Sequence, residues 1–222
     1  MARFYPAFVG DFHGSEGERL AYHALEMLGD DYTVFHSYCW LGDGVRTAAQ
    51  GEADFLVLHP RHGILAIEVK AGGIAYEGGA WQQTNRNTGE THVIYPFQQA
   101  ENSCRRVLAE LRRRVPQNVP LVGKAVWFTS VQIPQGKPLP LESPRDIILD
   151  ADDLRAPKER LERIRVLAQY TSHSGAHAVA GGVSAGHSHP AARVPYRGDT
   201  CLCVGGGGAV DGTVDERAVR AA

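Results

Sequence analysis

Residues 51–72, GEADFLVLHPRHGILAIEVKAG, contain three acidic residues and Lys70, and two of the acids have a spacing that could bind a metal ion. Asp54 stands at the start of one apolar run, and Glu68 stands near the end of the next. Carboxylates suit Mg²⁺ and Mn²⁺, and proteins commonly hold Mg²⁺ with one or two acids plus water and substrate phosphate. We therefore predict that Asp54 and Glu68 bind a divalent cation, with the backbone carbonyl of Val69 as a third oxygen.

Lys70 would lie beside the metal, because side chains alternate along a strand and Glu68 and Lys70 then share one face. An ammonium there could stabilise charge on a scissile phosphate or orient an attacking water, which predicts phosphodiester hydrolysis. The alternative is an exposed ion pair of Glu68 with Lys70. Burial favours the site, since the run GILAIEV suits a central strand and a buried charged pair needs partners to offset its desolvation.

The strands and the helix that would position these residues can be predicted from the pattern of apolar residues. Residues 55–58 and 64–69 are aliphatic runs separated by Pro60 and Gly63, which predicts a hairpin of two buried strands. Glu52 precedes the first of these runs, so we favour Asp54 over it as the ligand. Ser15 can cap a helix running to about Leu28, in which Gly17 allows a close backbone approach.

Further strands and helices are expected on both sides of the hairpin. Residues 1–13 show no period and predict an irregular lead-in, whereas 32–40 read as a strand. A short hairpin over 74–82 should extend the sheet. The remaining elements, in chain order, are a helix from Pro96 to Pro116, strands over 121–129 and 146–149, and a helix opened by Pro157. This order predicts an α/β fold with a mixed central sheet flanked by helices.

Composition limits the partners and the location of the chain. Its 222 residues carry a net charge of -2, so no global basic field draws it to nucleic acid. A local cluster on the predicted second helix could contact phosphates or could be a solvated helix face; it comprises Arg105, Arg106, Arg112, Arg113 and Arg114. Sparse cysteines, with no visible export signal or membrane span, predict a cytoplasmic protein.

The last part of the chain changes character after Tyr170. Residues 171–222 are rich in Gly, Ala and His and lack Ile, Phe, Trp and Lys, which predicts a disordered tail. We expect one folded domain over 14–170. The abrupt change suggests that the tail arose by truncation or frameshift of a longer protein.

Four motifs in this order resemble the nuclease-related domain (NERD) family, which is similar to the PD-(D/E)XK nucleases: Gly17-Glu18, Gly51-Glu52-Ala53-Asp54, Ile67-Glu68-Val69-Lys70 and Pro96-Phe97-Gln98-Gln99-Ala100. The resemblance implies a restriction-endonuclease-like αβββαβ core, metal binding by Asp54 and Glu68, and a catalytic lysine at Lys70. It also implies an accessory acid at Glu18 and a polar contact at Gln99. Glu16 and Gln98 remain their local rivals.

Both accessory residues also have ordinary explanations. Glu18 could be a capping-box partner of Ser15, and Gln99 a solvated helix residue. The histidines, among them His36 and His59, are expected to be ordinary surface or strand residues.

The predicted function is that of a metal-dependent nuclease acting on DNA. One alternative is a non-catalytic nucleic-acid-binding or docking module that uses Arg105, Arg106 and Arg112. Another is the N-terminal remnant of a fusion of a NERD domain with a helicase, or a domain that associates with a helicase. No GxxxxGK[ST] loop occurs in the sequence, so we expect no ATP site in this chain.

Overall fold

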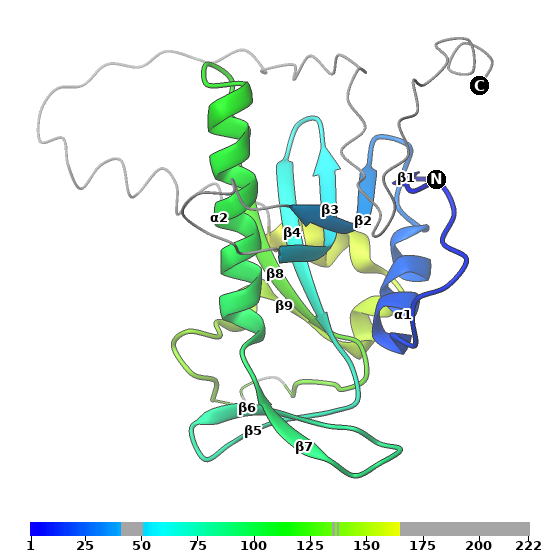
Figure 1. Cartoon of the computed structure of the whole chain (residues 1–222), viewed down its shortest axis with the longest axis vertical. Coiled ribbons are helices and arrows are strands. Elements are labelled where there is room, and N and C mark those ends of the chain that lie inside the picture. Colours follow the sequence, from blue (N-terminus) through cyan, green and yellow to red (C-terminus); the bar gives the residue numbers. More distant parts are fainter. Residues whose placement is uncertain (41–50, 135, 137, 165–222) are drawn as a thin grey trace, which may run out of the picture.

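The computed structural model describes residues 1–40, 51–134, 136 and 138–164 (Figure 1). A six-stranded mixed sheet forms its centre, in the order β1-β2-β3-β4-β8-β9. These strands are β1 (Arg3–Tyr5), β2 (Thr33–Trp40), β3 (Gly51–His59), β4 (Gly63–Lys70), β8 (Val122–Phe128) and β9 (Ile148–Leu149). The helices are α1 (Glu16–Leu25), α2 (Pro96–Arg114), the short 3₁₀ helices η1 (Arg145–Ile147) and η2 (Ala151–Leu154), and a helix over 157–164. The elements α1, β2, β3, β4, α2 and β8 give the predicted αβββαβ order.

The hairpin of β3 and β4 is confirmed and lies at the centre of the sheet. β4 pairs antiparallel with β3 and parallel with β8, so both of its edges are occupied. Gly63, at the start of β4, has φ +79°, and a Cβ there would lie 2.3 Å from the carbonyl oxygen of Leu121. Only glycine combines that conformation with that approach, which explains the break that the sequence places between the two runs.

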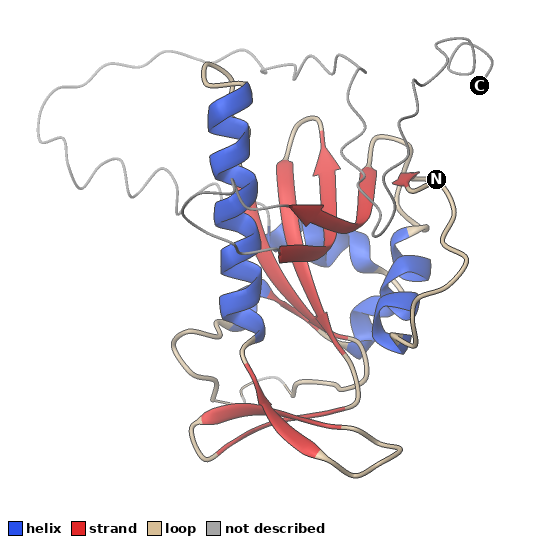
Figure 2. Ribbon diagram, in the orientation of Figure 1, coloured by secondary structure: helices blue, strands red, loops and turns tan. Residues whose placement is uncertain are grey.

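Helices cover the two faces of this sheet, α1 on one side and α2 on the other (Figures 1 and 2). On the first face, Ile67 and Trp127 are buried in a cluster with Leu25 of α1. On the second, Phe128 packs against Phe97 and other residues of α2. β4 is therefore apolar on both faces except at its C-terminal end, where Glu68 and Lys70 lie.

The second predicted hairpin forms, because β5 (Gly73–Glu77) and β6 (Ala80–Thr84) pair antiparallel, but the prediction that it extends the main sheet is wrong. With β7 (Thr91–Ile94), these two strands form a separate three-stranded sheet (Figure 2). Gly72, with φ +93°, directs the chain away at the end of β4, which is paired with β8 as far as Lys70 and with β3 as far as Ile67. The small sheet instead packs through Trp81, whose ring stacks on Phe128 at 5.0 Å between centroids.

Three smaller predictions also need correction. Residues 3–5 are not irregular but form β1, parallel to β2. The helix expected to reach Leu28 ends at Leu25, although Leu28 is buried. Of the strand expected over 146–149, only the last two residues are extended. Strands of two or three residues give no readable alternation, so the sequence could not show them.

The last described helix begins at Pro157, as predicted, and buries Leu161 and Ile164. Its predicted continuation lies outside the described residues, as do the tail over 171–222 and the loop over 41–50. No helix in the described part of the chain is long and apolar enough to cross a membrane.

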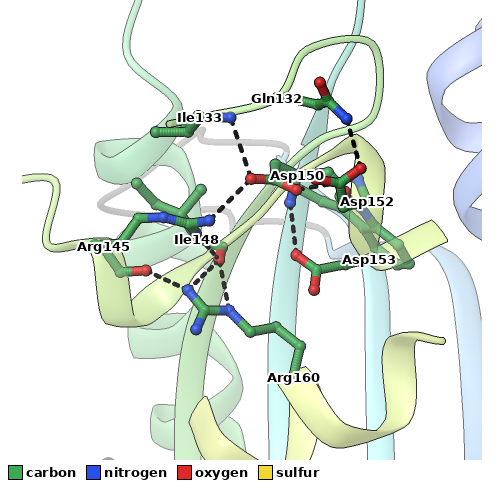
Figure 3. A network of polar contacts seen from close by, with 9 residues as sticks. Gln132, Ile133, Arg145, Ile148, Asp150, Asp152, Asp153 and Arg160 are labelled. Carbon is green, nitrogen blue, oxygen red and sulfur yellow. Dashed lines mark hydrogen bonds and ion pairs between the residues drawn. The ribbon is translucent and has the colours of Figure 1, made fainter. Parts of the chain in front are cut away.

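A buried carboxylate fixes the β9 edge of the sheet (Figure 3). Asp150 is 3% exposed, and its Oδ2 accepts from the Arg145 guanidinium at 2.9 Å and from the Ile133 N–H at 3.2 Å. Arg160, on the last described helix, donates to the carbonyl oxygens of Ile148 and Arg145. This network ties the last helix to β9, and it is separate from the acids of β3 and β4.

Gly17 sets how closely α1 approaches the end of β4. A Cβ at this position would lie 2.7 Å from Cβ of Ala71, 3.1 Å from Oγ1 of Thr129 and 3.3 Å from Cγ1 of Val69. Real Cβ atoms almost never come as close as the first of these distances, so the helix backbone rests directly on the sheet. The close approach predicted for Gly17 is confirmed, and it brings the backbone of α1 next to the C-terminal end of β4. Glu18 is the next residue of this helix.

Gly17→Ala should lower the free energy of unfolding by about 1–3 kcal/mol, measured by urea denaturation. The added methyl group must push α1 off the sheet, which outweighs the ~1 kcal/mol by which alanine favours a helix over glycine. Gly10→Ala is the control, since its Cβ would meet only the Phe8 ring at 3.5 Å. Equal stability of Gly17→Ala and wild type would contradict the close approach.

Candidate active site

Asp54 lies where the sheet opens. The β3–β4 ladder ends at the pair Phe55 and Ile67, so Asp54 and Glu68 are the next facing residues beyond it. On the other side, the β2–β3 ladder passes from His36 to Tyr38 without a pair at Ser37, whose φ is +52°. Asp54 is thus released from regular pairing with both neighbours, which leaves its side chain able to turn toward β4.

Clusters of buried side chains confirm that β3 is distorted at this point. Ala53 and Phe55 are two residues apart and should share a face. Instead, Phe55 belongs to the cluster beneath α1, and Ala53 belongs to the cluster that includes Val107 of α2. The distortion centres on Asp54, so alternation alone cannot say where its side chain points.

The three predicted central residues are connected by hydrogen bonds. Asp54 Oδ2 accepts from the Val69 N–H at 2.7 Å. Lys70 Nζ donates to Glu68 Oε1 at 2.7 Å, and Glu68 is 4% exposed. The expected contact between Glu68 and Lys70 on one face is therefore observed, and it is not an exposed surface pair.

The backbone of Val69 also faces Asp54. The neighbouring carbonyl, that of Lys70, accepts from the Thr129 N–H on the β8 side. Because successive carbonyls of a strand point to opposite edges, the Val69 carbonyl points toward β3, beyond the last pair of the β3–β4 ladder. This orientation suits the third oxygen ligand that the sequence suggests.

Burial makes the two carboxylates compete for ionisation. It raises the pKa of Asp54 to about 8, and the charge of Glu68 acts in the same direction, against the Val69 hydrogen bond. Burial likewise raises the pKa of Glu68, although the Lys70 ammonium opposes that shift. The pair therefore retains a proton near neutral pH. A divalent cation would allow both groups to ionise, so the residues present fit a hard metal ion.

Glu18 acts on this pair from α1. Its charge raises the pKa of both Asp54 and Glu68. Burial alone would raise the pKa of Glu18, but hydrogen bonds from His36 and Ser15 and the charges of His36 and Lys70 outweigh burial and lower it. Glu18 is consequently a carboxylate at neutral pH.

The position of Glu18 distinguishes it from its rival and from a simple capping residue. Ser15 caps α1 as expected, accepting from the Glu18 N–H at 3.4 Å, but the Glu18 carboxylate lies 3.0 Å from Nε2 of His36. Glu16 is exposed and pairs with Arg19 at 2.6 Å, on the helix surface.

Gln99 is exposed, and among the described residues the hydrogen bonds of Asp54, Glu68 and Lys70 do not involve its side chain. One turn later on the same helix face, Ser103 donates to the Glu52 carbonyl at 3.4 Å, so this face looks toward the start of β3.

Gln98 faces elsewhere, on a cavity of about 510 Å³ between α2 and the small sheet. Tyr95, Trp81, Glu101 and Lys124 also line this cavity. The structure thus separates the two glutamines, and Gln99 is the one on the helix face that looks toward β3.

The arginines of α2 are largely engaged with acids of the same helix. Arg105 pairs with Glu101 at 2.5 Å, and Arg113 pairs with Glu110 at 2.8 Å. Arg112 is exposed, and it has no ion pair with the residues that the structure describes.

His36 was not expected to matter. It is 8% exposed and bonds to Glu18, so it differs from the ordinary strand histidine that the sequence suggested. No local pattern marks it, because its partner lies 18 residues away on a helix. Within the described residues, no group of three or more His, Cys, Asp or Glu side chains is arranged to hold a metal. A metal here would use two carboxylates and a carbonyl.

The raised pKa of Asp54 predicts that stability depends on pH. The folded protein keeps this proton up to about pH 8, whereas the unfolded chain loses it near pH 3.8. Between these values the folded state holds more protons, so the free energy of unfolding falls as pH rises. Asp54→Asn can still accept from Val69 but cannot ionise. In EDTA at pH 8 it should be about 1–3 kcal/mol more stable than wild type.

Urea denaturation at pH 5 and pH 8 measures this effect, and the stability advantage of Asp54→Asn should be smaller at pH 5 than at pH 8. Asp11→Asn is the control, because the Asp11 side chain is 74% exposed and should show no such change between the two pH values. An Asp54→Asn protein no more stable than wild type at pH 8 would contradict the raised pKa.

Comparison with known proteins supports the site's family. Residues 13–131, more than half of the chain, match the nuclease-related domain, NERD. No curated protein and no solved structure matches the chain. The matched stretch runs from before α1 to the end of β8, so it contains all the elements that position Glu18, Asp54, Glu68 and Lys70. The chain therefore belongs to the nuclease-related domain family.

Proposed function

We propose that this chain is a metal-dependent nuclease that hydrolyses phosphodiester bonds of DNA at Asp54, Glu68 and Lys70. One observation carries the proposal: the half-buried carboxylate of Asp54 and the buried carboxylate of Glu68 face each other where β3 and β4 separate, and desolvation together with the Glu68 charge raises the pKa of Asp54 to about 8. Such a pair is costly to maintain without a cation. The nuclease-related family supports the reaction class.

The metal would be held by the carboxylates of Asp54 and Glu68 and by the Val69 carbonyl. When bound, Mg²⁺ or Mn²⁺ supplies Lewis-acid stabilisation of charge on the phosphate and a water of lowered pKa. The Val69 N–H orients Asp54 through a 2.7 Å hydrogen bond, which sets the direction of one carboxylate before any ligand arrives. Burial of Glu68 excludes water from the other.

Lys70 supplies the positive charge of the site. Its ammonium lies 2.7 Å from Glu68, and its side chain is 18% exposed, so it can meet a substrate from solvent. In that position it can stabilise the charge that develops on a phosphate oxygen or orient the attacking water. Glu18, ionised and close enough to influence both other acids, acts as the accessory acid.

Lys70→Met should lower the rate of Mg²⁺- or Mn²⁺-dependent cleavage of supercoiled plasmid by about 100-fold or more, because it removes the only ammonium proposed to act on the phosphate. Asp54→Ala should abolish cleavage. Lys124→Met is the matched control, since Lys124 also pairs with a glutamate, Glu101, but on β8 beside α2. It should cleave as wild type does. Cleavage that survives both Lys70→Met and Asp54→Ala would rule out the site.

DNA would be held by the arginines of α2. Arg105 and Arg112 are seven residues apart, so they lie on one face of the helix, and both are exposed. Arg106 lies beside them on the helix. These residues would also serve the rival function, a module that binds nucleic acid without cutting it.

The cytoplasmic location and association with a helicase stay predictions.

Arg112→Ala should weaken duplex DNA binding in EDTA and reduce the slope of log affinity against log salt by about 1, as expected for one lost phosphate contact. Fluorescence anisotropy at several salt concentrations measures both. Arg113→Ala should have the smaller effect, because that guanidinium is engaged by Glu110. Equal effects would remove the role of Arg112, whereas binding without metal-dependent cleavage would favour the rival function.

A further inference from the structure

We infer that His36 is a positioning residue that holds the Glu18 carboxylate toward the Asp54 and Glu68 pair, so that Glu18 contributes to the affinity of this site for a divalent cation. The inference rests on the proposed function and concerns a residue outside the motifs of the family resemblance.

The geometry of the contact links two elements. Nε2 of His36, on β2, lies 3.0 Å from Oε2 of Glu18, on α1. The Glu18 side chain is 23% exposed, whereas the His36 side chain is 7% exposed, so the imidazole is the fixed member of the pair. Glu18 is in the first turn of α1, where backbone N–H groups lack helical partners and ends fray. A bond to the sheet removes that freedom from the acid.

The imidazole itself is held by aromatic packing. Its centroid lies 5.4 Å from that of Phe12, 5.9 Å from that of Tyr22 and 5.0 Å from that of Phe55. These rings come from the segment before α1, from α1 and from β3. Because three sides of the ring are enclosed, rotation away from Glu18 would require the core to open.

His36 also lies beside the distortion that places Asp54. It is the last residue of β2 before the missing pair at Ser37, and it faces Phe55, the neighbour of Asp54 on β3. One residue therefore contacts both the acid of α1 and the strand that carries the first acid of the pair. The bond couples the position of Glu18 to the place where β2 and β3 lose their regular pairing.

The chain contains a natural comparison in His59. This histidine is 5% exposed, and its Nε2 lies 2.8 Å from Asp31 Oδ2. Its Nδ1 accepts from the Arg61 N–H in the turn after β3, whereas its Nε2 reaches Asp31 before β2, so both nitrogens are engaged. His59 is five residues beyond Asp54, about 17 Å along the strand. Like His36, it is buried and bonded to a carboxylate, but its partner is Asp31 and it lies away from the site.

The test measures Mn²⁺ binding to the full chain without DNA, by isothermal titration calorimetry. His36→Asn retains an amide but cannot reach Glu18, and it should weaken Mn²⁺ binding roughly tenfold, as loss of a partner of a metal site commonly does. His36→Gln places its amide nitrogen near the position of Nε2 and should restore most of the affinity. His59→Asn should leave the Mn²⁺ affinity unchanged, although it also loses a buried contact.

A double-mutant cycle tests whether His36 acts through Glu18. Glu18→Gln should weaken Mn²⁺ binding by itself, and adding His36→Asn to it should cause no further loss. The inference is overturned if His36→Asn costs as much in the Glu18→Gln background as in wild type, or if His59→Asn causes the same loss. If His36→Asn does not fold, Glu18→Asp withdraws the carboxylate from an intact His36 and should show the loss, and unchanged affinity overturns the inference.

Failure of the proposed function gives a different result. A wild-type protein that binds no Mn²⁺, with Asp54→Asn indistinguishable from it, would remove the metal site and the inference together. A wild-type protein that binds Mn²⁺ through Asp54, with Glu18→Gln and His36→Asn both unchanged, would remove the inference and leave the metal site.

Discussion

The electrostatic cost of holding two carboxylates, Asp54 and Glu68, in a partly desolvated position is the constraint on which the rest of this structure depends. Desolvation contributes most to raising the pKa of Asp54, and the charge of Glu68 adds to that shift. The fold offsets the cost with one backbone N–H, from Val69, and one ammonium, from Lys70. Neither is enough to return the pKa of Asp54 to its ordinary value. The site therefore keeps an unsatisfied electrostatic demand that a divalent cation would meet.

The central strands meet this constraint through the way they separate. Where β3 pairs with β4, from Phe55 to His59, the two strands form a regular antiparallel ladder in which the side chains other than that of His59 are apolar. Beyond Phe55 and Ile67 the ladder stops, and the Val69 amide becomes available to Asp54. β4 nevertheless stays fixed, because it continues to pair with β8 as far as Lys70 and Phe128. One strand is thus rigid and carries two charged residues, while its neighbour bends to bring the third.

The sequence could predict the parts of this arrangement that depend on local pattern. Alternation in GILAIEVK placed Glu68 and Lys70 together, and Ser15 marked the start of the helix that carries Glu18. The sequence could not predict that β3 is distorted at Asp54, since the distortion coincides with a positive φ at Ser37, on a different strand. It could not show that His36 contacts Glu18, because that contact depends on how α1 crosses β2. The separate small sheet was missed because apolar runs do not reveal which edges of β4 are already paired.

The charged residues of α2 would affect how the site binds DNA. With a net charge of -2, the chain has no general attraction for DNA, and most of the arginines of α2 are already bonded to Glu101 or Glu110. A phosphate must compete with those glutamates for each guanidinium, so the helix gives a weaker field than its arginine content suggests. Binding energy would then have to come from the site itself, where the Lys70 ammonium and the cation demand of Asp54 and Glu68 are concentrated. A weakly attractive helix beside a concentrated group of charges would favour contact at a single phosphate over extended binding of the DNA backbone.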